Sequence, residues 1–431
     1  MLFILFKEEL MKKLVGLLLA AVIAFPASAA VIQNVELKGE VQTIASDVKY
    51  QNAANYLPYN RGAWTRAIAG LSFDVVEDVK ANLLFQYSYN WGDNNYTNNG
   101  FDSAEGMKLV NANLELFNLF CCLDVTIGRQ FYGEDGSPVI YFGPNHYNAE
   151  GGLATALDAV TVRYSDDFKT FTVLAGSVAD ITKGGIDKID TNIRYARWVP
   201  ANIFGADLKL NFTDALKASV YGYDVKTKGY LHDSEGNIDK PLNGIVGEYT
   251  GAYGAKLGWD GDVLRASAEY ARNFDGHRLV KERKDTGYMA KADIAADINA
   301  FTARGSFVYA KNFLSLGNYA PGMMFGDMLS LDGYNRNIFN MFGMTNIGLR
   351  MFNVGFDVRP SAKWTVSLDG YSFQNRYGRH SATYEADLTA KYAHNEYVEL
   401  FAGVAYAKMG FGLNKNHSEN YKAQIGTLVR F

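Results

Sequence analysis

The chain has few of the residues that divide large proteins into domains or anchor them by helices. Its 431 residues contain eight prolines and two cysteines, and no Pro/Ser-rich linker or block of one charge interrupts them. Beyond residues 1–29, no apolar run reaches the ~20 residues that a membrane-spanning helix needs. The formal net charge of −4 does not supply the concentrated cations that bind nucleic-acid phosphates. These absences argue against several domains, a helical membrane protein and a nucleic-acid partner.

Motifs for catalysis are also absent. The sequence has no HExxH or GxSxG arrangement, and its six histidines fall in expected loops, turns or strand ends. We therefore predict that the chain is not an enzyme and needs no cofactor. Cys121 and Cys122 are adjacent, so their side chains alternate across a strand, and we expect a structural or incidental role. The alternative is a strained vicinal disulfide.

One loop has the oxygen spacing of a calcium site. Side chains with oxygen atoms alternate around Gly236, as they do in a calcium-binding loop: Asp233, Glu235, Asn237 and Asp239. The downstream bidentate Glu and the flanking helices of such loops are missing. The loop is therefore interpreted either as a solvated turn or as a weak calcium site.

The first 29 residues resemble a secretory signal. Met11–Lys13 form a basic start, Leu14–Phe25 an apolar run and Ala27–Ala29 a small-residue cleavage site. We expect residues 1–29 to be removed, with a mis-called start codon before Met11. Residues 30–431 are then predicted to form one domain, because no change in amino-acid composition divides them.

The final stretch, 419–431, predicts the architecture. Apolar or amphipathic side chains occupy one face of an extended chain, and mostly polar ones occupy the other. The first face holds Tyr421, Ala423, Ile425, Thr427, Val429 and Phe431. A strand that ends on an aromatic residue is typical of the strand that closes a bacterial outer-membrane barrel. Residues 79–91 show the same alternation and end in the Tyr and Trp residues expected of an aromatic girdle.

Eighteen such segments follow one another, and the connections between them are alternately long and short. They are 35–44, 63–75, 79–91, 107–117, 122–130, 157–164, 168–179, 204–212, 216–225, 248–259, 263–273, 286–298, 300–313, 345–358, 363–373, 381–392, 397–407 and 419–431. Bacterial single-chain barrels have an even strand number, short periplasmic turns and long outer loops. The sequence predicts an all-β protein, a single antiparallel transmembrane β-barrel of 18 strands, with 16 as the alternative. Segments 180–200 and 314–344 could fold into its lumen.

Charged residues on the polar parity of each strand are expected to line a pore, because charge facing lipid is costly. The predicted pore-lining residues are Arg66, Lys80, Glu115, Arg129, Arg163, Lys209, Lys256, Arg265, Glu269, Lys291, Arg304, Asp369, Glu385, Asp387, Lys391 and Glu399. Cations and anions nearly balance, which favours a hydrated lumen of mixed charge over a simple electrostatic filter. Pairing between neighbouring strands is the competing explanation for any one of these charges.

Two segments break the alternation. Leu123, Val125 and Ile127 face outward, which would put Arg129 in lipid unless Gly128 marks a bulge or the residue lies above the bilayer. In 345–358 the apolar phase switches, so we expect a bulge near Met351.

Four stretches resemble the alginate-export-type family of outer-membrane barrels. They are LDVTIGRQFYGEDGSP (123–138), ALDAVTVRY (156–164), YEADLTAKY (384–392) and VELFAGVAYAKMG (398–410). The resemblance implies a monomeric 18-stranded barrel whose arginine-rich lumen passes an anionic polysaccharide, and Arg129, Asp158 and Arg163 are the matching positions. The balanced lumen departs from that pattern.

The sequence therefore predicts a channel in the outer membrane of a Gram-negative bacterium, with both termini in the periplasm. Small hydrophilic solutes, including sugar acids, are expected to pass it down their gradients. A non-selective diffusion porin or structural major outer-membrane protein, and a polysaccharide exporter, are the alternatives. Expected partners are membrane lipid, the solutes and the barrel-assembly machinery, which would bind the strand ending in Phe431. We expect a monomer rather than a trimer.

Overall fold

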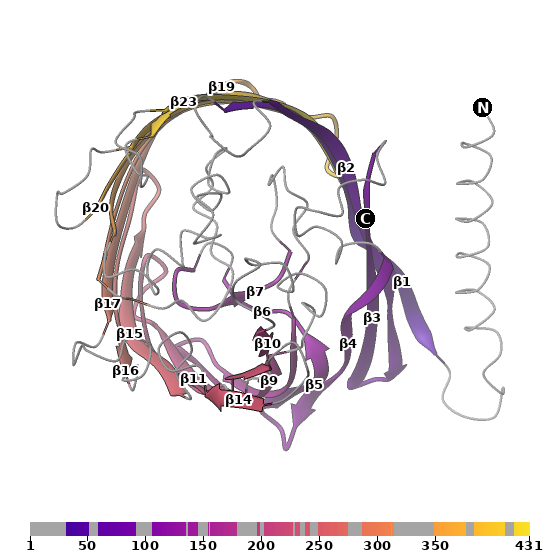
Figure 1. Ribbon diagram of the computed structural model, residues 1–431. Helices are drawn as coiled ribbons and strands as arrows, with labels where there is room; N and C mark the ends of the chain where they lie inside the picture. The colour runs from indigo at the N-terminus through magenta and orange to yellow at the C-terminus, as the bar shows by residue number, and fades with distance from the viewer. Residues whose placement is uncertain are drawn as a thin grey trace, which may run out of the picture.

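The computed structural model shows a closed ring of strands (Figure 1). It describes residues 32–50, 59–91, 106–134, 137–144, 154, 156–178, 196–198, 202–226, 229–232, 238–241, 249–274, 287–311, 313, 349–375, 383–409 and 418–431. The wall is one antiparallel sheet of 18 strands, which confirms the predicted number over the alternative of 16. Within these ranges, no helix is long and apolar enough to cross a membrane.

The wall strands correspond to the predicted segments. They are β1 (Gln33–Tyr50), β2 (Tyr59–Val76), β3 (Val79–Asn90), β4 (Gly106–Leu119), β5 (Leu123–Gln130), β8 (Leu157–Ser165), β9 (Lys169–Val178), β11 (Asn202–Asn211), β12 (Leu216–Lys226), β15 (Tyr249–Asp260), β16 (Leu264–Phe274), β17 (Tyr288–Ile298), β18 (Phe301–Lys311), β19 (Leu349–Ser361), β20 (Trp364–Asn375), β21 (Thr383–Ala393), β22 (Val398–Met409) and β23 (Ser418–Arg430). Two small sheets lie outside the wall sheet: β6 (Tyr132–Gly133) with β7 (Tyr141–Phe142), and β10 (Ala196–Trp198) with β13 (Gly229–His232) and β14 (Ile238–Pro241).

The last strand closes the barrel. β23 pairs with β1 in register from Glu40↔Arg430 to Tyr50↔Asn420. Beyond the strand, Gly39 and Phe431 exchange two backbone hydrogen bonds, with N···O distances of 2.8 and 3.0 Å. The closing role predicted for residues 419–431 is therefore confirmed. Closure leaves the wall without an open edge whose backbone groups would need water.

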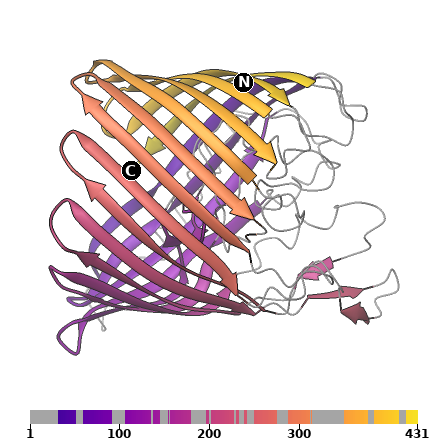
Figure 2. The same cartoon turned by 90° about the vertical axis from the view of Figure 1, so that its left-hand side faces the viewer.

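Short turns join the strands at one end of the barrel, and the strand ends at the other end lead into connections that lie mostly outside the described residues (Figure 2). Side chains fix the short turns by accepting backbone hydrogen bonds. Asp166 Oδ1 accepts the N–H groups of Phe168 and Lys169, at 2.9 and 2.8 Å. Thr213 Oγ1 accepts the N–H of Leu216 at 2.9 Å in the turn between β11 and β12. Local polar chemistry thus sets the positions at which the chain reverses.

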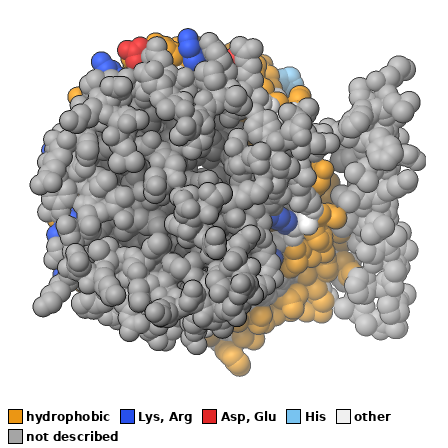
Figure 3. Space-filling model, in the orientation of Figure 1, with side chains coloured by type: hydrophobic (Ala, Val, Ile, Leu, Met, Phe, Trp, Pro, Cys, Tyr) orange, Lys and Arg blue, Asp and Glu red, His pale blue; other side chains and the backbone are white. Residues whose placement is uncertain are grey.

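The outer wall exposes large apolar side chains at alternate positions. On β19, Phe352, Val354 and Phe356 are each about half exposed, and the residues between them are buried. Figure 3 shows hydrophobic side chains gathered on the part of the outer wall where described atoms are visible. Such a band around a closed barrel is the surface that faces hydrocarbon in membrane barrels.

The prediction of a bulge near Met351 is wrong. β19 pairs with β18 and β20 without interruption through this residue, and its register shifts only at Val358/Ser361. Met351 is buried because it faces an apolar cluster inside the barrel. Apolar residues of both parities therefore occur on β19 without any slip. Cys121 and Cys122 are free thiols exposed in the turn before β5, so the vicinal disulfide does not form.

Arg129 lies on the outer face of the wall, which corrects its placement among the pore-lining residues. Its Nε and Nη2 donate to the two carboxylate oxygens of Asp158, at 2.7 and 2.8 Å. Asp158 points outward, since Leu157 and Ala159 on either side of it are buried in the internal cluster. Gly128 has φ +122°, yet Ala112↔Arg129 and Arg129↔Asp158 keep the register, so no bulge turns Arg129 inward. The bidentate pair neutralises both charges on the outer face.

Several expectations fall on residues outside the described ranges. These are the signal at 1–29, segment 314–344, most of segment 180–200, and Asp233, Glu235 and Asn237 of the calcium loop. Of that loop, Asp239 lies in β14, where its backbone pairs with Leu231.

We predict that Asp158→Asn destabilises the barrel by about 2 kcal/mol, because it leaves the Arg129 charge without its carboxylate on the lipid-facing side. Urea unfolding in lipid vesicles, followed by tryptophan fluorescence, measures the loss. Adding Arg129→Gln to this variant should recover most of it.

The matched control for this prediction is Asp297→Asn, which breaks the Arg265–Asp297 pair of the same 2.7 Å length on the hydrated inner wall. Its effect should be smaller, because water screens that pair. Equal losses in both variants would contradict the assignment of Arg129 to the outer face.

Candidate functional site

The connection from β5 to β8 enters the barrel. Its described residues form a hairpin in which Tyr132 pairs with Phe142 and Gly133 with Tyr141. Figure 1 shows β6 and β7 inside the ring of wall strands. We expected 132–155 to be an ordinary long loop and considered infolding only for 180–200 and 314–344. The apolar run Val139–Phe142 was the sequence signal for infolding, since an outer loop surrounded by water would leave these apolar side chains exposed.

Apolar contacts fix the hairpin against the inner wall. Val139, Ile140 and Phe142 are buried in one cluster with inward-facing side chains of the wall. The main wall members are Leu157, Leu174, Ile203, Met289, Val308 and Met351. At this level the inner wall is apolar rather than polar, which the alternation rule did not predict. Burying each large side chain is worth roughly 1.5–3 kcal/mol, so the cluster holds the hairpin firmly.

Polar contacts also anchor the connection. Tyr132 Oη donates to Asp207 Oδ2 at 2.9 Å, and its ring meets that of Tyr223 edge to face at 6.1 Å. Burial raises the pKa of Tyr132 far above its usual value, so the hydroxyl stays protonated and remains a donor. Where the chain returns toward β8, Gln86 Oε1 accepts the N–H of Ala154 at 2.8 Å.

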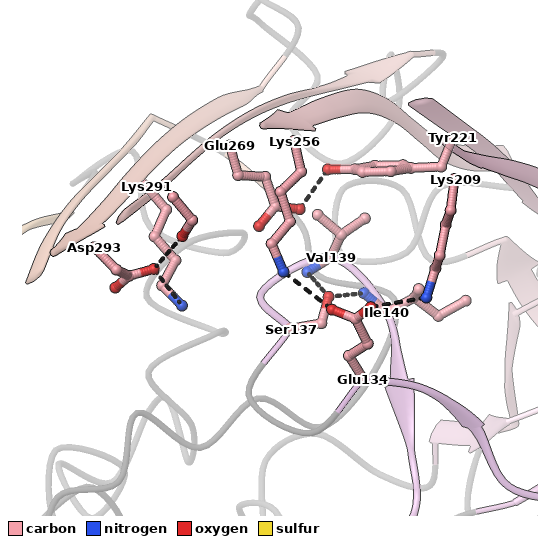
Figure 4. A network of polar contacts seen from close by, with 11 residues as sticks. Glu134, Ser137, Val139, Ile140, Lys209, Tyr221, Lys256, Glu269, Lys291 and Asp293 are labelled. Atoms are coloured by element: carbon pink, nitrogen blue, oxygen red, sulfur yellow. Dashed lines mark hydrogen bonds and ion pairs between the residues drawn. The ribbon is translucent and has the colours of Figure 1, made fainter. Parts of the chain in front are cut away.

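Glu134, on the hairpin, is held by two lysines of the wall. Lys209 Nζ on β11 lies 2.8 Å from its Oε1, and Lys256 Nζ on β15 lies 3.0 Å from its Oε2 (Figure 4). Burial opposes ionisation of this carboxyl, but the two ammonium groups outweigh it and lower the pKa of Glu134 to about 2. The carboxylate is therefore charged throughout the physiological range. The sequence analysis missed Glu134 because its partners Lys209 and Lys256 are far away in the chain, and no local pattern relates them to it.

The charges continue along the wall from Lys256. Cross-strand pairs share a face, and Lys256 pairs with Glu269, which pairs with Lys291. Tyr221 Oη donates to Glu269 Oε1 at 2.6 Å, and Lys291 Nζ lies 3.3 Å from Asp293 Oδ2 (Figure 4). Cations and anions thus alternate along this stretch of wall.

A cavity of about 480 Å³ lies between the hairpin and this wall. Its charged lining residues are Glu115, Asp124, Glu134, Arg163, Asp207, Lys209, Lys256 and Glu269. Tyr132, Tyr221 and Tyr223 add aromatic surface and hydroxyls to the lining. A lining of both charge signs with tyrosines can hold a small polar solute that carries a carboxylate, through ion pairs and hydrogen bonds.

Other predicted residues lie elsewhere on the inner wall and are held in contacts of their own. Arg66 is fully buried and donates to Glu40 at 2.7 Å. Arg304 Nη2 contacts Asp357 at 2.7 Å and Asp369 at 3.1 Å. The remaining contacts are Lys80 with Glu36 at 3.7 Å, Arg265 with Asp297 at 2.7 Å, and Glu115 with Asn82 at 2.9 Å.

A third group of predicted residues lines β20 to β22. Asp369 pairs in register with Asp387, and Glu385 and Asp387 are buried. Lys391 pairs with Phe401, and Glu399 with Leu428, whose side chain is buried on the inner face. Apart from Arg129, the predicted pore-lining residues therefore face inward. The structure brings Arg163, Lys209, Lys256 and Glu269 together with Glu134 at one cavity, and Lys291 lies next to them. Among the described residues, no group of three or more His, Cys, Asp or Glu side chains is placed to hold a metal ion.

No family model and no curated protein matches this chain. Solved structures do match it over nearly its whole length. A BenF-like porin from Pseudomonas fluorescens Pf-5 aligns with a TM-score of 0.62 at 8% identity, covering 92% of this chain and 99% of the porin. OccK11 (OpdR) of Pseudomonas aeruginosa aligns with a TM-score of 0.59 at 9% identity, covering 94% and 99%.

A third match is the outer-membrane protein OpdK of Pseudomonas aeruginosa in a crystal structure with vanillate. Its TM-score is 0.58 at 11% identity, and the alignment covers 92% of this chain and 99% of OpdK. None of these structures bears on the resemblance to the alginate-export-type family, which stays a prediction. At such low identity the matches establish the architecture, and this chain has the fold of outer-membrane porins.

Proposed function

We propose that this chain is an outer-membrane channel through which small hydrophilic solutes, sugar acids among them, pass down their gradients. The observation that carries the proposal is the infolded hairpin, which narrows a closed barrel to a cavity lined by charges of both signs. The fold shared with outer-membrane porins supports the same location and a passive mechanism. A channel of this kind needs no catalytic group, because the gradient drives transport.

Carboxylate-bearing solutes fit the cavity because it already holds a carboxylate. The ammonium groups of Lys209 and Lys256 contact the two oxygens of Glu134, at 2.8 and 3.0 Å. A solute carboxylate that enters the cavity meets the same donors and competes with Glu134 for them. Tyr221 and Tyr223 offer hydroxyls for the rest of a polyhydroxylated solute. Glu134 keeps these lysines from holding a solute too tightly, and weak binding is what conduction requires.

The charges of the inner wall and the infolded hairpin bear differently on the two alternative functions. A non-selective diffusion porin is favoured by the near balance of charge on the inner wall. A polysaccharide exporter is disfavoured by a hairpin that lies across the path of a long polymer. The resemblance to the alginate-export-type family therefore extends, in this proposal, to the barrel and not to the transported polymer.

The orientation and assembly of the barrel complete the proposal. The short turns and both termini face the periplasm, as in other bacterial barrels. Phe431 is exposed on the outer face beside Gly39 and serves as the signal that the barrel-assembly machinery binds. We propose that the chain works as a monomer, for which the ring that one chain forms is sufficient.

Planar-bilayer conductance tests the proposed function. We expect a small conductance and a reduction of the current by millimolar glucuronate but not by glucose. A large conductance without ion preference, unaffected by glucuronate, would identify a general diffusion porin instead.

Glu134→Gln should shift the ion selectivity severalfold toward anions, because it leaves the charges of Lys209 and Lys256 without this carboxylate in the cavity. Reversal potentials in salt gradients measure the change. Glu36→Gln is the matched control: it removes one carboxylate that contacts Lys38 and Lys80, at 3.3 and 3.7 Å, away from the hairpin. An equal shift in both variants would show that Glu134 has no special position in the pathway.

The difference in ion selectivity between the wild type and Glu134→Gln should also depend on pH. The pKa of Glu134 is lowered to about 2, so its ion pairs with Lys209 and Lys256 persist above its ordinary value near 4.5 and are lost only as pH falls through about 2. The difference in selectivity between wild type and Glu134→Gln should therefore stay constant from pH 7 to about pH 4. It should shrink as pH approaches 2. A difference that already vanishes at pH 4 to 5 would mean that the two lysines do not hold this carboxylate.

A further inference from the structure

The cavity beside the hairpin contains more negative than positive side chains. Among its described lining residues, carboxylates outnumber cations by five to three. A solute carboxylate is repelled by like charges and binds only at a cation that the protein has not already neutralised. The affinity for such a solute therefore depends on which lining carboxylates are held by the lysines and which are held by other donors.

Lys209 and Lys256 share a single carboxylate. Their Nζ atoms lie 2.8 and 3.0 Å from the two oxygens of Glu134, and in the described part of the chain these are the ion pairs that the two lysines form. Two ammonium groups on one carboxylate leave this group of three side chains with a net positive charge. That charge is what attracts a solute carboxylate into the cavity.

Two other carboxylates are close enough to neutralise these lysines. Asp207 precedes Lys209 by two residues on β11, so it shares a face with that lysine at a distance of about 7 Å along the strand. Glu269 is directly opposite Lys256 in the register of β15 and β16, where paired Cβ atoms are about 5 Å apart. A lysine side chain can span either separation. The pairing of both lysines with Glu134 therefore requires that something else holds Asp207 and Glu269.

A tyrosine hydroxyl holds each of these two carboxylates. Tyr132 Oη, from the hairpin, donates to Asp207 Oδ2 at 2.9 Å. Tyr221 Oη, from β12, donates to Glu269 Oε1 at 2.6 Å. Figure 4 shows Glu269 bonded to Tyr221 while the neighbouring Lys256 extends to the hairpin. Hydrogen bonds to a charged acceptor are among the stronger ones in proteins, so both carboxylates are firmly held.

The packing of the rings fixes the positions of these hydroxyls. The ring of Tyr223 stacks on that of Tyr221 with centroids 5.9 Å apart, and it meets that of Tyr132 edge to face at 6.1 Å. Tyr223 is buried in the apolar cluster, and the other two rings pack against it. A hydroxyl on a packed ring loses little conformational freedom when it forms a hydrogen bond, whereas a lysine side chain loses much more. The tyrosines therefore compete well for the two carboxylates.

We propose that the hydroxyls of Tyr132 and Tyr221 determine the affinity of the cavity for carboxylate solutes. Tyr132 keeps Asp207 away from the two lysines that contact Glu134, and Tyr221 does the same for Glu269. The inference rests on the proposed function and adds the positioning residues that set its specificity. Each tyrosine acts through the carboxylate that it holds. Without the hydroxyls, those carboxylates pair with the lysines, and the positive charge that attracts the solute is neutralised.

The concentration of glucuronate that halves the single-channel current tests the proposal. Tyr132→Phe and Tyr221→Phe keep the rings and remove the hydroxyls. Each should raise this concentration about fivefold, because a buried carboxylate that loses its donor pairs with the nearest cation instead. Adding Asp207→Asn to the first variant, and Glu269→Gln to the second, should restore the wild-type value. A purely structural loss would not be restored by removing a second charge.

The matched control is Tyr164→Phe, which removes a hydroxyl that donates to Asp166 at 2.9 Å, at the short-turn end and outside the cavity. Its half-blocking concentration should equal that of the wild type. Equal values in the cavity variants, or a loss that the second substitution does not restore, would overturn the proposal and leave the proposed function intact. A wild-type current that glucuronate does not reduce would contradict the proposed function itself, and this proposal with it. The two tyrosines are tested separately, so that if one variant does not assemble the other decides.

Discussion

The structure depends on one constraint: within a bilayer every backbone N–H and C=O must find its partner in the protein. A β-sheet meets it only by closing, and here β23 pairs along β1 until Gly39 and Phe431 bond to each other. Closure divides every strand into an inner and an outer face with a period of two residues. Each side chain of the wall then faces either the interior or the surrounding membrane, according to its parity.

A closed ring of this size leaves an interior that the chain must partly fill. The hairpin between β5 and β8 does so, using Val139, Ile140 and Phe142 to cover an apolar level of the inner wall. The same hairpin brings Glu134 to Lys209 and Lys256. The packing that stabilises the hairpin therefore also places this carboxylate at the two lysines, so the position of the hairpin and the charge of the cavity depend on the same segment.

The outer face is more than a uniform apolar surface. Where a charge occurs among lipid-facing residues, as at Arg129, a carboxylate on the neighbouring strand neutralises it through two hydrogen bonds. On β16, β18 and β19, Arg272, Lys311 and Arg350 are paired in register with tyrosines of the neighbouring strands.

The sequence by itself determined the strand number, the closing strand and the inward direction of Lys209, Lys256 and Glu269, because a two-residue period is local and independent of distant contacts. It could not determine where the infolded hairpin packs or the position of Glu134, whose partners Lys209 and Lys256 are 75 and 122 residues away in the chain. It also left Arg129 ambiguous, since its partner Asp158 is 29 residues away on another strand. Only the closed tertiary structure decided these contacts, because closure brings together residues that no local pattern relates.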